Sequence, residues 1–133
     1  MVQRKRTIFS KQAPTPVGPY SQAIRAGSFI FISGQVPVNP TTGEFVKGSM
    51  TLQTQRCMDN IKAIITAAGG SLKNIVKTTI FLTNMNDFQE VNEAYGNYFD
   101  LEPPARTTIQ AAALPKGVAI EIDAVAYVAD KKE

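Results

Sequence analysis

Apolar residues recur at every second position in several segments, which is the spacing of β-strands that bury one face. The alternation is clearest near the C-terminus, where Glu121, Asp123 and Tyr127 fall on the side opposite the apolar positions. Gly27-Ser28 separates two strand-like runs and predicts a β-hairpin. The predicted strands cover residues 7–10, 22–26, 29–33, 75–83, 106–113 and 118–128.

Two other segments show helical periodicity. The first covers residues 50–68 and ends at Gly69-Gly70, because glycine accepts the left-handed conformation of a helix C-terminus. Its apolar stripe contains Cys57, Met58, Ile61, Ile64, Ile65 and Ala68. The second covers about residues 87–99, and Asn86 with Gln89 resembles a capping box at its start. Its apolar face contains Phe88, Val91, Tyr95, Tyr98 and Phe99.

The order of these elements, ββ-α-β-α-ββ, predicts an α+β fold in a single domain over residues 1–133. We expect one mixed sheet with both helices on one face. The other face would carry Phe29, Phe31 and Val125. An apolar face of this kind is usually buried against another copy of the same chain, so the pattern predicts self-association.

Composition excludes several kinds of chemistry. The chain has no histidine, which excludes a histidine metal site and any Ser-His-Asp or Cys-His catalytic arrangement. Its one cysteine, Cys57, excludes an internal disulfide, and its place on the helical stripe predicts an inert core residue. A single free thiol favours a reducing, cytoplasmic location. No apolar run is long enough to cross a bilayer, so no membrane partner is expected.

The net charge of +3 originates at the N-terminus, because no acidic residue precedes Glu44. We expect about residues 1–12 to form a basic, frayed segment around Arg4-Lys5-Arg6. This acid-free start has the character of an organellar transit peptide but is short for one, which leaves a mitochondrial location open. The basic residues are few and are not interleaved with stacking aromatics, so nucleic acid is not the expected partner.

Several positions carry a polar residue or glycine where a packed apolar residue is expected: Tyr20, Ser33, Gly34, Asn92, Arg106 and Glu121. Each has an ordinary structural explanation. Glu121 can face solvent from a one-sided strand, Arg106 can form a surface ion pair, and Gly34 can permit a β-bulge. No one of these residues therefore supports a functional assignment by itself.

Taken together, blocks of residues from about Ala13 to Val128 resemble the Rid/YjgF family. They are Gly18-Pro19-Tyr20-Ser21-Gln22-Ala23, Ser33-Gly34-Gln35-Val36-Pro37, Asn60-Ile61-Lys62, Ala67-Ala68-Gly69, Val76-Lys77-Thr78-Thr79, Asn86-Asp87-Phe88, Val91-Asn92, Pro104-Ala105-Arg106, Leu114-Pro115-Lys116-Gly117 and Ile120-Glu121-Ile122. The resemblance implies a chorismate-mutase-like fold and a homotrimer with a central barrel of sheets and clefts between subunits. It implies hydrolysis of 2-imino acids and their enamines to a 2-oxo acid and ammonia, with no cofactor.

The resemblance also implies roles for site residues. Arg106 would bind the substrate carboxylate with its planar fork. Glu121 would exchange protons with the attacking water and the leaving nitrogen, helped by Tyr20. Asn92, Ser33, Gly34 and Thr108 would orient the substrate. The chain departs from the family at Thr107, where a smaller residue is more usual, and at Thr108, where many members carry cysteine.

Two other functions remain open on the sequence. Some members of the family are described as ribonucleases or translation inhibitors, and Arg4-Lys5-Arg6 gives an RNA-directed function some support. A non-enzymatic protein that binds small carboxylates or a protein partner is the third alternative.

Overall fold

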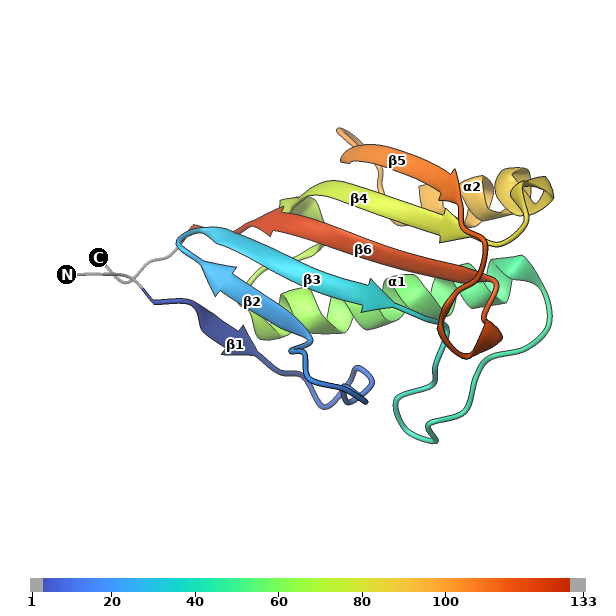
Figure 1. Ribbon diagram of the computed structural model, residues 1–133. Coiled ribbons are helices and arrows are strands. Elements are labelled where there is room, and N and C mark those ends of the chain that lie inside the picture. Colours follow the sequence, from blue (N-terminus) through green and yellow to red (C-terminus); the bar gives the residue numbers. More distant parts are fainter. Residues whose placement is uncertain (1–3, 130–133) are drawn as a thin grey trace.

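Six strands form one mixed sheet, and two helices cover one of its faces (Figure 1). The computed structural model describes residues 4–129. The strands are β1 (Arg6–Ile8), β2 (Ala23–Ala26), β3 (Phe29–Gln35), β4 (Ile75–Leu82), β5 (Ala105–Gln110) and β6 (Ile120–Tyr127), and the helices are α1 (Met50–Ala67) and α2 (Phe88–Gly96). Short 3₁₀ turns lie at Leu72–Asn74, Met85–Asp87 and Pro115–Gly117. The predicted fold class, α+β with one mixed sheet and two helices, is confirmed.

The strand order is β1-β2-β3-β6-β4-β5, and only β4 and β5 are parallel neighbours. The last strand of the chain therefore lies in the middle of the sheet. Its alternation is as predicted: Ile120, Ile122, Ala124 and Ala126 are buried on the helix side. The predicted hairpin is also present, with Gly27 at a φ of 64° between β2 and β3.

Helix α1 supplies most of the helix side of the core. Its predicted stripe is buried, including Cys57, Ile61 and Ile64, which have no exposed surface. Ser49 caps its N-terminus by accepting a hydrogen bond from the backbone N–H of Leu52. Gly69 follows its C-terminus at a φ of 88°, as the sequence predicted.

Helix α2 differs from the prediction at both ends. The predicted capping box of Asn86 and Gln89 is wrong, because Asp87 is the N-cap residue and makes no side-chain capping bond. The side chain of Asn84 instead accepts from the backbone of Asn86 and caps the preceding 3₁₀ turn. The helix ends at Gly96, and Tyr98 and Phe99 still pack against the core from the turn that follows.

The end of β4 sets the limits of both strands beside it. Leu82, its last residue, pairs with Gln110 of β5 and with Ile120 of β6. The N–H of Ala111 donates to the Leu82 carbonyl at 2.7 Å and the N–H of Thr83 donates to the Ala119 carbonyl at 3.1 Å, and the regular ladder does not continue past these bonds. Strand β5 therefore stops before the predicted residue 113, and β6 starts after the predicted residue 118.

The N-terminal segment is more ordered than expected over its described residues. Arg6–Ile8 pair with β2, and Ser10 is buried with its N–H bonded to the side chain of Gln22 at 2.6 Å. The expectation of a frayed segment is therefore wrong for residues 6–10. Residues 1–3 lie outside the described part.

The sheet face opposite the helices is partly apolar and exposed, as predicted. Phe29, Phe31 and Tyr127 expose 44%, 48% and 50% of their surface. Their rings are neighbours, with centroids of Phe29 and Tyr127 5.3 Å apart. We call the side of the sheet away from α1 and α2 the open face.

Cys57→Ala should lower the free energy of unfolding by about 1–2 kcal/mol and leave the activity that the family resemblance implies intact. The substitution removes the buried sulfur atom and leaves a small cavity. Burial also raises the pKa of the thiol, so a reactive thiolate is disfavoured. Urea denaturation checks the stability, and a thiol reagent should react only with unfolded protein. Activity lost in a folded Cys57→Ala variant would contradict an inert core role.

Candidate active site

Strands β3 and β6 are out of step by one residue where Glu121 and Gly34 meet. Ile32 pairs with Ala124 and Gln35 pairs with Ile122, so two residues of β3 oppose one of β6. This is the bulge that Gly34 was expected to permit. The Glu121 side chain fills the space beside Gly34: a Cβ at Gly34 would lie 2.8 Å from its carboxyl carbon. A side chain at position 34 would displace the Glu121 carboxylate from this place.

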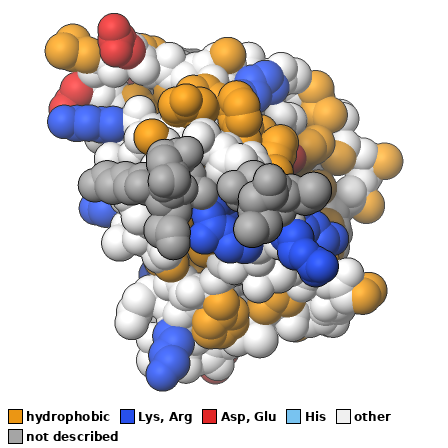
Figure 2. All heavy atoms as spheres, turned by 90° about the vertical axis from the view of Figure 1, so that its left-hand side faces the viewer, with side chains coloured by type: hydrophobic (Ala, Val, Ile, Leu, Met, Phe, Trp, Pro, Cys, Tyr) orange, Lys and Arg blue, Asp and Glu red, His pale blue; other side chains and the backbone are white. Residues whose placement is uncertain are grey.

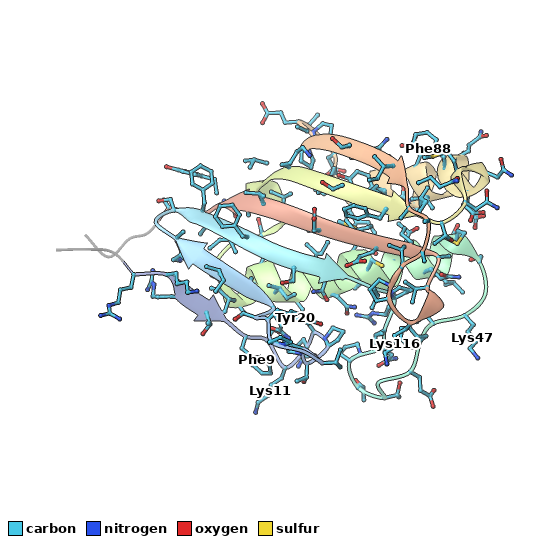
Figure 3. All side chains as sticks on the ribbon, viewed as in Figure 1. Phe9, Lys11, Tyr20, Lys47, Phe88 and Lys116 are labelled. Atoms are coloured by element: carbon cyan, nitrogen blue, oxygen red, sulfur yellow. The ribbon has the colours of Figure 1, made fainter. Side chains whose placement is uncertain are left out.

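Two hydrogen bonds tie Ser33 to the loop that leads into β2. The Ser33 hydroxyl donates to the carbonyl of Ser21 at 2.6 Å, and its N–H donates to the carbonyl of Gln22 at 2.9 Å. Buried Gln22 in turn donates to the carbonyls of Ser10 and Pro14. The loop carrying Tyr20 is therefore held against the end of the sheet (Figure 3).

Tyr20 and Ser33 line one hollow of about 550 Å³ on the open face, together with Lys77, Thr79 and Asp123. Tyr20 is 51% exposed, so its hydroxyl can reach a ligand. We call Tyr20, Ser33, Gly34 and Glu121 the Glu121 group.

The pKa of the Glu121 carboxyl group is raised above its ordinary value. Partial burial raises its pKa, and the nearby charge of Asp123 raises it further. Burial also raises the pKa of Asp123, although hydrogen bonds from Thr79 and the charge of Lys77 oppose that rise. A carboxyl group with a raised pKa is suited to general acid–base catalysis.

Arg106 lies on the side of the sheet that the helices cover. It pairs with Thr78, which is fully buried, and its guanidinium carbon lies 5.6 Å and 5.2 Å from the ring centroids of Phe88 and Tyr95 in α2. Thr108 is two residues along the same strand, so it shares this face. Its hydroxyl oxygen is buried and makes no hydrogen bond within the described residues.

Asn92 is exposed on α2, so the prediction that it lies on the buried stripe is wrong. It follows Phe88 by one helical turn, and Phe88 is itself 37% exposed. Asn92 therefore lies on the outer side of α2, next to a ring that contacts Arg106. We call Asn92, Arg106 and Thr108 the arginine group.

The two groups lie on opposite faces of the sheet within one chain. In β4, Thr78 pairs with Arg106 and Phe81 pairs with Glu121. These two β4 residues are three positions apart and so point to opposite faces. In Figure 3, Phe88 lies near the β5 edge of the sheet and Tyr20 lies near the opposite edge, where β1 and β2 are. The predicted site residues therefore do not form one pocket in a single chain.

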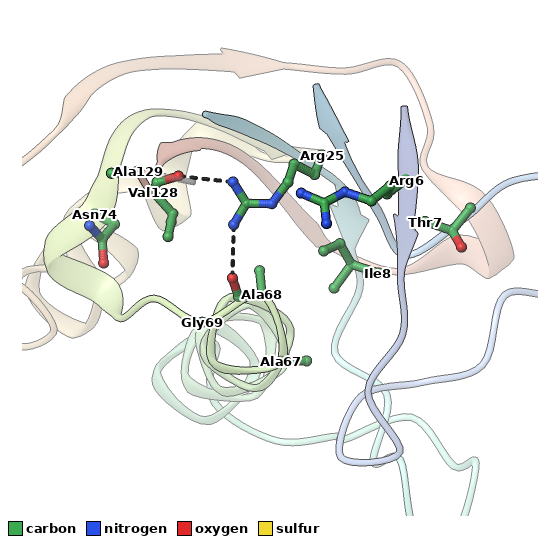
Figure 4. A pocket seen from close by; sticks show the side chains of 10 residues that line it. All are labelled: Arg6, Thr7, Ile8, Arg25, Ala67, Ala68, Gly69, Asn74, Val128 and Ala129. Carbon is green, nitrogen blue, oxygen red and sulfur yellow. Dashed lines mark hydrogen bonds between the residues drawn. The ribbon is translucent and has the colours of Figure 1, made fainter. Parts of the chain in front are cut away.

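Arg25 is a charged residue that sequence reasoning did not single out. It lines a hollow of about 600 Å³ with Arg6, yet only 7% of its surface is exposed (Figure 4). Its guanidinium donates to the carbonyls of Val128 at 2.9 Å, Gly27 at 3.1 Å and Ala68 at 3.1 Å. These bonds join the β2–β3 hairpin, α1 and the end of β6, which indicates a structural role.

Within residues 4–129, no cluster of three or more Asp, Glu or Cys side chains has the arrangement of a metal site. In the same part of the chain, neither helix has the length and apolar character that crossing a bilayer requires.

Known proteins define the class to which this fold and these residues belong. The family model described as Endoribonuclease L-PSP matches residues 10–128. A RutC family protein of Pyrococcus horikoshii is 53% identical over 92% of this chain and 98% of its own. A human protein named 2-iminobutanoate/2-iminopropanoate deaminase is 45% identical over 92% of this chain and 89% of its own.

Solved structures agree with this result. RidA of an Antarctic Psychrobacter has a TM-score of 0.89 and 42% identity, covering 92% of this chain and 99% of its own. E. coli TdcF, solved with bound serine, has a TM-score of 0.88 and 42% identity, covering 92% and 98%. The chain belongs to the L-PSP family, also called YjgF/Rid, and the resemblance found in the sequence is confirmed. The family includes imine deaminases.

Glu121→Gln should raise the free energy of unfolding at neutral pH. The pKa of Glu121 is raised in the folded chain. At a pH above 4.5, the ordinary pKa of this group, the carboxyl group therefore loses its proton more readily in the unfolded chain than in the folded chain. Ionisation of Glu121 at rising pH therefore lowers the free energy of unfolding, and glutamine, which does not ionise, removes this loss of stability. The gain should shrink as the pH falls below 4.5.

Urea denaturation across this pH range measures the effect, with exposed Glu44→Gln as the control. A Glu121→Gln variant that is less stable than the wild type at neutral pH would show that the ionised carboxylate is stabilised by its contacts.

Proposed function

We propose that this protein hydrolyses 2-imino acids, such as 2-iminopropanoate and 2-iminobutanoate, and their enamine tautomers, to a 2-oxo acid and ammonia. The observation that carries the proposal is the state of Arg106. Its guanidinium stacks on aromatic rings, and no carboxylate within residues 4–129 pairs with it. Its donors are therefore available for a ligand carboxylate, which a planar guanidinium binds in bidentate fashion.

The proposed reaction needs little more than orientation and proton transfer. Once its nitrogen is protonated, the imine carbon is electrophilic enough for water to attack. Glu121 takes a proton from this water and later returns one to the nitrogen, which leaves as ammonia. Tyr20 hydrogen-bonds to the water or the substrate, and the raised pKa of Glu121 suits a group that must both take and give a proton.

Asn92, Ser33, Gly34 and Thr108 bind and orient the substrate in this proposal. The buried Thr108 hydroxyl lacks a partner within the described residues, and a bound ligand would supply one. The substrate class is also supported by the family membership and by the names of the human and mouse relatives.

A second copy of the chain completes the proposed site. The Glu121 group and the arginine group lie on opposite faces of the sheet. Strand β5, which carries Arg106, is an edge strand. A neighbouring copy that covers the open face can bring its own Glu121 group to this edge. We infer a homotrimer with three such clefts, as the family resemblance implies, and the exposed Phe29, Phe31 and Tyr127 support burial of the open face.

An RNA-directed function is the alternative. Figure 2 shows several separate Lys and Arg side chains on the end of the molecule where the β2–β3 hairpin lies. Arg6 and Arg25 line the hollow at this end, but the Arg25 guanidinium is engaged by three backbone carbonyls. Arg25 is therefore not available to phosphate, and any binding of RNA at this hollow should weaken as the salt concentration rises.

The mass in solution should be near three times 14.4 kDa by sedimentation at micromolar concentration. Phe31→Lys should reduce it, because the substitution places a charge on the open face. Leu52→Lys, on the exposed side of α1, is the matched control and should leave the mass unchanged. A wild-type chain that sediments as a monomer would remove the proposed intersubunit site.

Arg106→Lys and Glu121→Gln should both lower the rate of imine hydrolysis, but for different reasons. A serine or threonine dehydratase generates the imine, and release of 2-oxo acid and ammonia is followed with and without this protein. Arg106→Lys should weaken binding of a 2-oxo acid and cost roughly 2–4 kcal/mol of transition-state stabilisation, because a point charge cannot replace a bidentate fork. Glu121→Gln should keep that binding but slow turnover roughly a hundredfold.

Glu44→Gln is the control for loss of one carboxylate, since Glu44 is exposed in a loop. A Glu121→Gln enzyme at the wild-type rate would make Glu121 structural and leave Tyr20 as the next residue to test. Full activity in both variants, together with salt-sensitive RNA binding, would favour the RNA-directed function.

A further inference from the structure

Tyr95 joins α2 to the strands that carry the arginine group. Only 4% of its surface is exposed, and its hydroxyl lies 2.6 Å from the hydroxyl of Thr78, which is fully buried. Thr78 is the residue of β4 that pairs with Arg106. The hydrogen bond therefore fixes the Tyr95 ring relative to the backbone beside Arg106.

The ring is held on its other side as well. Phe99 packs against Tyr95 with centroids 5.0 Å apart and an angle of 47° between the ring planes. The Arg106 guanidinium lies 5.2 Å from the Tyr95 centroid and 5.6 Å from that of Phe88. Two rings from one helix thus contact the guanidinium, and one of these rings is immobilised by a hydrogen bond and by packing.

This arrangement suits a group that must bind an anion. A long arginine side chain loses rotamer freedom when it binds a ligand, and holding it in advance reduces that loss. Aromatic rings attract a guanidinium without neutralising it. A carboxylate partner would hold Arg106 equally well, but it would compete with the carboxylate of the substrate.

We propose that Tyr95, fixed by its hydrogen bond to Thr78, is a positioning residue for Arg106, with Phe88 as the second ring. It acts through Arg106 on the binding of the substrate carboxylate and does not itself take part in proton transfer. This inference rests on the proposed function, because it assigns Tyr95 to the carboxylate-binding half of that site.

The test compares Tyr95→Leu, which removes the ring, with Tyr95→Phe, which keeps the ring and removes the hydroxyl. Calorimetry gives the Kd for pyruvate, and the coupled dehydratase assay gives KM and kcat. Tyr95→Leu should raise Kd and KM about tenfold, the scale of a lost cation–π contact, while kcat changes less than about threefold. Tyr95→Phe should restore Kd to within about threefold of the wild type.

Val91→Ala is the matched control, because Val91 is also buried on α2, with 1% of its surface exposed, and an aliphatic side chain makes no cation–π contact with Arg106. It should lower stability and leave Kd unchanged. Phe88→Leu tests the same proposal at a partly exposed ring whose loss the fold can tolerate, and it should also raise Kd. If Tyr95→Leu does not fold, Phe88→Leu alone tests the proposal.

The same substitutions in an Arg106→Lys background separate positioning from general damage. If Tyr95 acts through Arg106, Tyr95→Leu should weaken pyruvate binding much less in that background. Equal losses in both backgrounds, or wild-type Kd in folded Tyr95→Leu and Phe88→Leu, would overturn the inference while the proposed function stands. Wild-type pyruvate binding by Arg106→Lys would instead overturn the proposed carboxylate site, and this inference with it.

Discussion

Strand β6 lies between β3 and β4, and packing of α1 against one side of it organises the rest of the molecule. Ile120, Ile122, Ala124 and Ala126 are buried beneath the helix, so burial of apolar surface determines which way the strand faces. Because side chains alternate along a strand, Glu121 and the other intervening residues must then point to the open face. A shift of one residue would bury Glu121 and expose Ile122, which fixes the register strongly.

The two groups of candidate site residues follow from this register. Glu121 pairs with Phe81 on the open face, whereas Arg106 pairs with Thr78 on the side of the helices. The sheet keeps the Glu121 carboxylate and the Arg106 guanidinium apart, so neither neutralises the other within a chain. The same register leaves the aromatic residues Phe29, Phe31 and Tyr127 of the open face exposed in the single chain.

Different physical means hold each group in place. A β-bulge and the missing side chain of Gly34 make room for the Glu121 carboxylate, and its burial raises its pKa. Packing of α2 on the sheet brings aromatic rings to Arg106 and leaves its charge unpaired within the described residues. The partly buried Glu121 carboxylate reduces stability at neutral pH, because burial disfavours its charged form.

The sequence by itself determined the element order, the buried stripe of α1, the alternation of β6 and the motifs of the L-PSP family, because these depend on local periodicity and on neighbouring residues. It did not determine where α2 begins, since Asn84 and Asn86 can each form a local cap and packing selects between them. The end of β5 and the contact of Arg106 with Tyr95 were also decided only in the tertiary structure. Both depend on the parallel pairing of β4 with β5, which joins segments of the chain that no local pattern connects.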